Sequence, residues 1–321
     1  MNTTKRQSYV FFFLFLVLMG WLRLGPPFLA ILFSYFALEK LNFARNKWLT
    51  VVLFLTLVAA VFYGFAFFLK QAFVALPHVI STSIPSMLEF ARRHKIELPF
   101  DDMDSLKALT LDTVKSQMHG LGQFARVATK EFMFMVLGVA VAVTMFMNPK
   151  LDLERETHRL SRNLYSAWCE ALAERFRTFY ESFAVVMGAQ LTISAINTVL
   201  TAGFVFPIGL PYPLVIVGVS FLCGMLPIVG NLLSNAVIVA IAFTVSPQMA
   251  FSALVFLVLL HKLEYFLNSK IVGDRIKNPI WLTLVGLILG ERLMGIPGMI
   301  LAPVVLFFAR LEMGRLPAEE S

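Results

Sequence analysis

The chain has 321 residues, of which 58% are hydrophobic and 15% are charged, and its mean hydropathy is +0.77. A soluble domain carries about 25% charged residues, so this composition excludes an ordinary soluble protein and indicates a polytopic membrane protein in a lipid bilayer. The net charge of +7 does not indicate a nucleic-acid partner, because no basic patch with interleaved aromatic residues lies outside the segments that flank the apolar runs.

The first apolar region, residues 9–38, follows Lys5 and Arg6 and is interrupted by the sequence RLGPP at residues 23–27. A basic start before an apolar stretch is typical of a signal peptide, but no small-x-small cleavage site follows here. We therefore predict a membrane segment that is retained and that breaks at RLGPP.

Four segments have the length and composition of ordinary spans, since about 17–24 helical residues cross the ~30 Å of hydrocarbon in a bilayer. These segments are residues 49–69, 131–147, 183–206 and 250–267.

Two later apolar regions are interrupted like the first: residues 214–245 at LPIVGN and residues 281–309 at GERLMGIPG. Each half has only about 14 residues, which is short for a perpendicular span. A break at membrane depth frees backbone groups that lipid cannot satisfy, so it must be buried in protein or face water. Re-entrant hairpins and pairs of short, tilted spans remain alternatives for each region.

Two segments, residues 105–128 and 160–183, are amphipathic and run into spans without a strong helix breaker. Each is either a helix lying in the membrane interface or a long helix that projects from the membrane and packs on a neighbour. The predicted fold class is therefore all-α: a polytopic helical membrane protein with broken or re-entrant helical hairpins and long amphipathic helices.

Lys and Arg cluster on one side of the predicted spans, which favours two cytoplasmic termini in a bacterial inner membrane. We predict four regions in chain order. They are an N-terminal hairpin with the first full span (1–70), an extracytoplasmic amphipathic region (71–130), a span with a cytoplasmic amphipathic helix (131–182) and a C-terminal transport core (183–321).

The C-terminal third carries a series of motifs in a fixed order. They comprise LPIVGN with Pro227 and Gly230, then Glu264, Asn268, Lys270, Gly273 and Pro279, and then Gly290, Gly295, Gly298, Ala302 and Pro303. This series, together with GPPFLAILFSYFALEKL near the N-terminus, resembles the autoinducer-2 exporter family of bacterial permeases, the PerM-like proteins.

The resemblance implies export of a small polar solute such as autoinducer-2, with coupling to sodium or protons left open, and a homo-oligomer, in particular a pentamer. Many family members carry an acidic residue just before the LPIVGN-like stretch, where this chain has Cys223, Gly224 and Met225. We therefore assign no role in sodium or proton coupling to that position.

Polar residues within apolar segments are the candidate pathway residues, because burying them in lipid is costly unless they line a path or find partners. The candidates, including those from the resembling motifs, are Gln190, Asn197, Pro227, Gly230, Asn231, Asn235, Glu264, Asn268, Glu291 and Arg292. As helix neighbours, Glu291 and Arg292 point apart, so each needs another partner, such as Glu264, or water. Interhelical hydrogen bonding without transport is the alternative role for the amides.

No nucleophile elbow, phosphate-binding loop or Cys/His cluster with metal spacing occurs in the sequence, so we predict no enzyme, no cofactor and no metal site. Three functions remain: a permease or exporter of a small polar solute, a sodium/proton antiporter that uses Glu264 or Glu291, and an oligomeric membrane scaffold that transports nothing.

Overall fold

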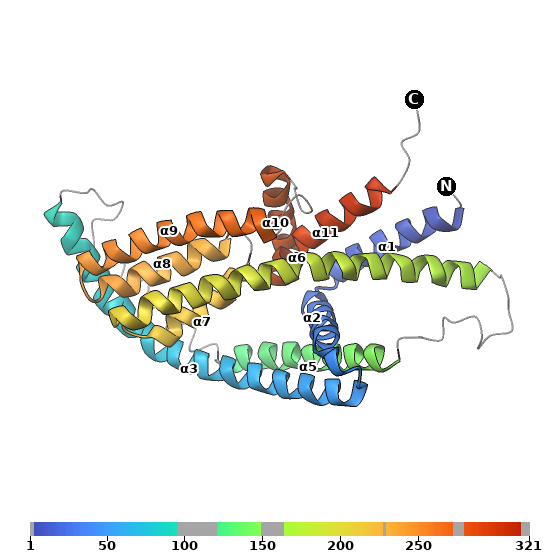
Figure 1. Ribbon diagram of the computed structural model, residues 1–321, viewed down its shortest axis with the longest axis horizontal. Helices are drawn as coiled ribbons and strands as arrows, with labels where there is room; N and C mark the ends of the chain where they lie inside the picture. The colour runs from blue at the N-terminus through green and yellow to red at the C-terminus, as the bar shows by residue number, and fades with distance from the viewer. Residues whose placement is uncertain (1–2, 95–120, 149–163, 227–228, 272–278, 316–321) are drawn as a thin grey trace, which may run out of the picture. The chain divides into compact units, whose positions relative to one another are not determined.

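A computed structural model of the chain describes residues 3–94, 121–148, 164–226, 229–271 and 279–315. These residues form α-helices and one short 3-10 helix, Asn42–Ala44, and no strand occurs among them (Figure 1). The predicted all-α fold with broken hairpins and long amphipathic helices is confirmed.

Several of the described helices are long and apolar enough to cross a membrane. They are α3 (Lys47–Arg93), α5 (Leu121–Met147), α6 (Leu164–Ile208), α9 (Pro247–Ile271) and α11 (Ile296–Gly314). The chain is therefore a multi-pass membrane protein, and four of these helices contain the four ordinary spans predicted from the sequence.

All three predicted interruptions are breaks between helices. They separate α1 (Thr3–Trp21) from α2 (Gly25–Leu41), α7 (Pro213–Gly224) from α8 (Val229–Phe243), and α10 (Ile280–Met294) from α11. The first pair is bent by 119°. Arg23 and Gly295 adopt positive φ angles of 52° and 66°, which an α-helix cannot continue through. Proline in the first turn then favours the start of α2 and of α11.

The halves of the broken regions are longer than the predicted 14 residues in most cases. Helices α1 and α11 have 19 residues each and α2 has 17, so α11 alone is long enough to be a span. The sequence estimate stopped at prolines and charges, but a proline in the first turn loses no helical hydrogen bond.

Helix α3 also extends beyond its prediction, because it continues through Lys70, Pro77 and Pro85 to Arg93. Its 47 residues would extend about 70 Å, more than twice the hydrocarbon thickness. Helix α6, with 45 residues, joins the amphipathic stretch that begins near residue 160 to the following span, which confirms the long-helix alternative there. Most of the other amphipathic stretch, 105–120, lies outside the described residues.

The chain divides into two compact units. Unit 1 comprises residues 1–59, 131–189 and 272–321, and unit 2 comprises residues 60–130 and 190–271. In unit 1 a core forms around Leu38, Phe54 and Ala142, from α2, α3 and α5.

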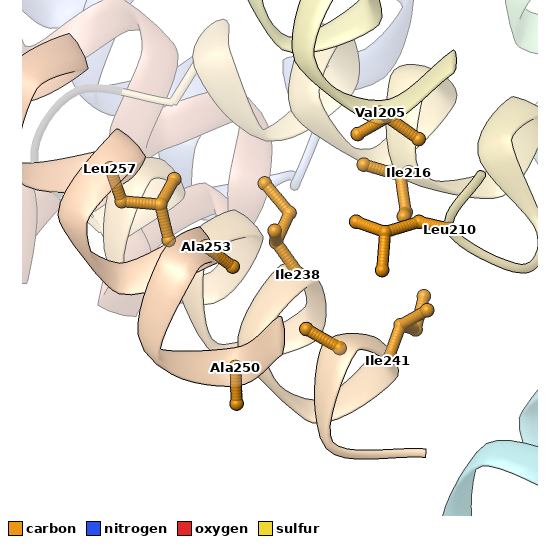
Figure 2. Close-up of a cluster of buried hydrophobic side chains, with 9 residues drawn as sticks. Val205, Leu210, Ile216, Ile238, Ile241, Ala250, Ala253 and Leu257 are labelled. Atoms are coloured by element: carbon orange, nitrogen blue, oxygen red, sulfur yellow. The ribbon is translucent and has the colours of Figure 1, made fainter. Parts of the chain in front are cut away.

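The core of unit 2 is a cluster of buried aliphatic side chains from α6, α7, α8 and α9 (Figure 2). Val205 of α6 and Ile216 of α7 lie in the same cluster as Ile238 of α8, and Ala250 and Ala253 of α9 complete it. This packing holds the four helices together near the ends where α8 turns into α9.

A buried charged network joins α1, α6 and α11 in unit 1. The side chains of Arg175 and Glu312, which are 3% and 4% exposed, form an ion pair. The Tyr9 hydroxyl donates to Glu312 at 2.7 Å and accepts from Arg175 at 2.8 Å. The network ties three helices that are far apart in the sequence.

Candidate functional site

A small polar cavity lies in unit 2 among α6, α7, α8 and α9. Its volume is about 20 Å³, which is enough for about one water molecule. The polar side chains that line it are Asn197, Thr201, Ser220, Asn231, Ser234, Asn235, His261 and Glu264, and Ile238, Leu257 and Leu260 complete the wall.

Helical spacing brings these side chains to one place. Asn231, Ser234 and Asn235 stand in the first two turns of α8 at steps of three and four residues, which places them on one face. The same spacing joins Asn197 to Thr201 on α6 and His261 to Glu264 on α9.

Glu264 is the carboxylate of the cavity, and its side chain is 13% exposed. Its Oε1 atom accepts a hydrogen bond from Asn231 Nδ2 at 2.7 Å. Its Oε2 atom lies 3.8 Å from Nδ1 of His261. One carboxylate oxygen is therefore held by an amide of α8, while the other faces an imidazole.

Two buried polar atoms at the cavity lack a hydrogen-bond partner in the described part of the chain: Asn197 Oδ1 and Ser220 Oγ. Leaving a buried polar atom unsatisfied costs about 1–3 kcal/mol. Both atoms can accept a hydrogen bond from a group in the cavity.

The break between α7 and α8 lies between the lining residues Ser220 and Asn231, and side chains of α6 hold the end of α7 in place. Gln190 Nε2 donates to the carbonyl oxygen of Gly224 at 2.6 Å. Ser194 Oγ donates to the carbonyl oxygen of Phe221 at 2.8 Å. These bonds satisfy carbonyls at the end of α7 that the helix itself leaves free.

Position 230, in the first turn of α8, requires a glycine for a steric reason. A Cβ atom at this position would overlap the carbonyl group of Cys223, so only glycine lets α8 start this close to the end of α7. Gln190 and Gly230 thus shape the cavity without being among its lining residues.

Four of the predicted pathway residues come together in the cavity: Asn197, Asn231, Asn235 and Glu264. Pro227 lies outside the described residues. Asn268 lies in α9, and its side chain also falls outside the described part.

Glu291 and Arg292 belong to unit 1 and do not line the cavity. Their side chains are 56% and 85% exposed. The prediction that they cannot pair with each other is wrong, because Arg292 Nε lies 4.0 Å from Glu291 Oε2. Long side chains in the last turn of α10 can curl toward each other in a way that helix spacing alone does not suggest.

Thr201, Ser220 and His261 also line the cavity, although the sequence did not single them out. Spacing offered a signal for two of them, since Thr201 follows Asn197 by four residues and His261 precedes Glu264 by three. Within the described ranges, no three His, Cys, Asp or Glu side chains come together in a way that could hold a metal ion.

The model of the AI-2E family of transporters matches residues 8–313 of the chain. The chain belongs to the AI-2E transporter family. That match includes every residue of the cavity and all three helix breaks, so the family resemblance predicted from the sequence motifs is confirmed.

A curated relative from Bacillus subtilis (strain 168), "Putative transport protein YdbI", is 25% identical over 179 residues. The matched part covers 55% of this chain and 51% of that protein, so the alignment spans about half the length of either.

Proposed function

We propose that this AI-2E family member exports a small polar solute, such as autoinducer-2, and that the solute binds in the cavity of unit 2 during transport. The proposal includes a bacterial inner membrane with two cytoplasmic termini, which the distribution of Lys and Arg favours, and a homo-oligomer, which the family resemblance implies. The observation that carries it is a group of six uncharged polar side chains and one carboxylate among helices that are otherwise apolar.

The lining chemistry suits a solute rich in hydroxyl groups. Amide and hydroxyl side chains offer both donors and acceptors, and a hydroxyl group of a solute can satisfy either kind. Asn197 Oδ1 and Ser220 Oγ are buried and have no partner among the described residues, so they are the first contacts that we assign to the solute.

The size of the cavity sets a condition on this mechanism. Sites for small molecules commonly have volumes of about 300–1,000 Å³, whereas this cavity has about 20 Å³. Solute entry therefore requires the wall to open.

Sodium/proton exchange is a second candidate, and the small volume favours it. A single water or a bare cation fits the cavity as it stands. Glu264 could exchange a proton for the cation, and the carbonyl oxygen of Asn197 is an uncharged oxygen ligand of the kind that hard cations prefer.

Flux in proteoliposomes tests both candidates. We expect Asn197→Ala to lower autoinducer-2 flux about tenfold or more, because a lost buried polar contact costs about 1–3 kcal/mol. We expect Glu264→Gln to abolish any dependence of that flux on an imposed pH gradient. Glu291→Gln is the matched control, since this carboxylate is exposed and lies in unit 1.

The two candidates give different results in the same vesicles. Sodium-driven proton movement in the wild type that Glu264→Gln removes, without autoinducer-2 flux, would support the antiporter. Wild-type protein that moves neither solute nor ions would refute both and leave the scaffold function.

A further inference from the structure

His261 occupies a position that joins the cavity to its surroundings. It is one of the lining residues, yet its side chain is 70% exposed, whereas that of Glu264 is only 13% exposed. The two residues are three positions apart on α9, and Nδ1 of His261 lies 3.8 Å from Oε2 of Glu264. The imidazole therefore reaches the carboxylate on one side, and the described residues leave its other side uncovered.

We propose that His261 delivers protons to Glu264 and removes them, an inference that rests on the proposed function of the cavity. Imidazole is the side chain suited to this task, because it can accept a proton on one ring nitrogen and release one from the other. Protonation of Glu264 then sets whether the cavity carries a negative charge.

The hydrogen bonds of Glu264 determine which oxygen takes the proton. Asn231 Nδ2 donates to Oε1, so this oxygen is already engaged. Oε2 is the atom that faces His261. Asn231 thus holds the carboxylate in the orientation that exposes Oε2 to the imidazole.

The transfer passes through one water molecule, because 3.8 Å is too long for a direct hydrogen bond. The cavity has room for that water. The imidazolium N–H bond breaks and its proton goes to the water, while a proton of the water forms the O–H bond on Glu264 Oε2. Imidazole and carboxyl group are then both neutral, and the reverse step returns the proton to His261.

Among the residues that line the cavity, His261 and Glu264 are the ones that can carry a charge. The polar groups that face it from α6, α7 and α8 are uncharged: Asn197 and Thr201, Ser220, and Asn231, Ser234 and Asn235. On α9 itself, Lys262 and Tyr265 are titratable and close in sequence, but both are exposed and neither lines the cavity.

Proton movement in pyranine-loaded proteoliposomes tests the proposal, with autoinducer-2 added in one arm and NaCl in the other. We expect His261→Gln to lower the proton flux at least about tenfold, in line with the usual contribution of a positioned proton donor. External imidazole should restore flux to His261→Gly, because it can occupy the space that the missing side chain leaves, and should not restore it to Glu264→Gln. His78→Gln is the matched control, since His78 is another exposed histidine of unit 2 and contacts Tyr212 instead of the cavity.

The results separate this inference from the function on which it rests. If Glu264→Gln abolishes proton flux while His261→Gln keeps it within twofold of the wild type, the role of His261 is refuted. The proposed function of the cavity is then still supported. Failure of imidazole to restore His261→Gly also refutes it. If Glu264→Gln keeps the wild-type flux, both the proposed function of the cavity and the role of His261 are refuted.

Discussion

At the scale of single residues, Arg175 shows that the sequence does not reveal whether a charged side chain is buried or what it pairs with. In the sequence it is one of the Lys and Arg residues from which we predict the orientation of the spans. In the structure its side chain is buried, paired with Glu312, and lies against the ring of Tyr9 at 4.5 Å. It also pairs with its sequence neighbour Glu174, but its buried partners Tyr9 and Glu312 are 166 and 137 residues away, so no local pattern could identify them.

We predict that Glu312→Gln destabilises the protein by about 1–3 kcal/mol, because it removes the buried counter-charge of Arg175 and leaves only the half-exposed Glu174, which lies 2.8 Å from the guanidinium. The double variant Arg175→Met with Glu312→Leu should recover most of that stability, since apolar side chains replace both charges. Unfolding in detergent measures both effects. An unfolding curve for Glu312→Gln that matches the wild type would contradict the prediction.

The exposed pair of Glu291 and Arg292 provides the control for this experiment. With side chains 56% and 85% exposed, the two groups are solvated with or without each other. Glu291→Gln should therefore change stability by no more than about 0.5 kcal/mol.

At the scale of elements, the positions of the helix breaks could be predicted from the sequence, because Gly, Pro and charges interrupt apolar runs at each of them. The residues at which the helices begin and end could not be predicted from the sequence. The structure continues α3 through two prolines, and α11 begins two residues before Gly298, where a break was expected. A proline in the first turn is compatible with the start of α11, whereas nothing in the local sequence indicates that α3 continues through Pro77 and Pro85.

The contact between α10 and α11 depends on two glycines. A Cβ atom on Gly298 would overlap the carbonyl group of Gly290, and the reverse is also true. We predict that Gly298→Ala destabilises the protein by about 1–3 kcal/mol, because the backbone of the hairpin must shift. Thermal unfolding of the purified variant measures the effect.

Gly203→Ala in α6 is the matched control, because no atom lies within 4 Å of the Cβ position there. An added methyl group in an open helical position should stabilise the helix by about 0.4–1 kcal/mol. Equal unfolding temperatures for Gly298→Ala and Gly203→Ala would show that the tight helix contact does not exist.

At the scale of the whole molecule, composition alone identified a helical membrane protein, and the order of the motifs identified its family. Half of the polar side chains that line the cavity were also predicted, because Asn197, Asn231, Asn235 and Glu264 stand out as polar residues in apolar runs. Their convergence could not be derived, since Asn231 and Glu264 are 33 residues apart and meet only through the packing of α8 on α9.

The measurement that tests the role of the cavity most directly is the reactivity of a thiol placed in it. In protein with Cys169→Ser and Cys223→Ser, we predict that Ser220→Cys reacts with a water-soluble thiol reagent while transport proceeds, and that autoinducer-2 or sodium slows this reaction. Val199→Cys is the control, because Val199 is an exposed residue of α6 that does not line the cavity. A thiol at position 220 that stays unreactive, or that reacts at the same rate with and without either solute, would contradict a transport path through this cavity.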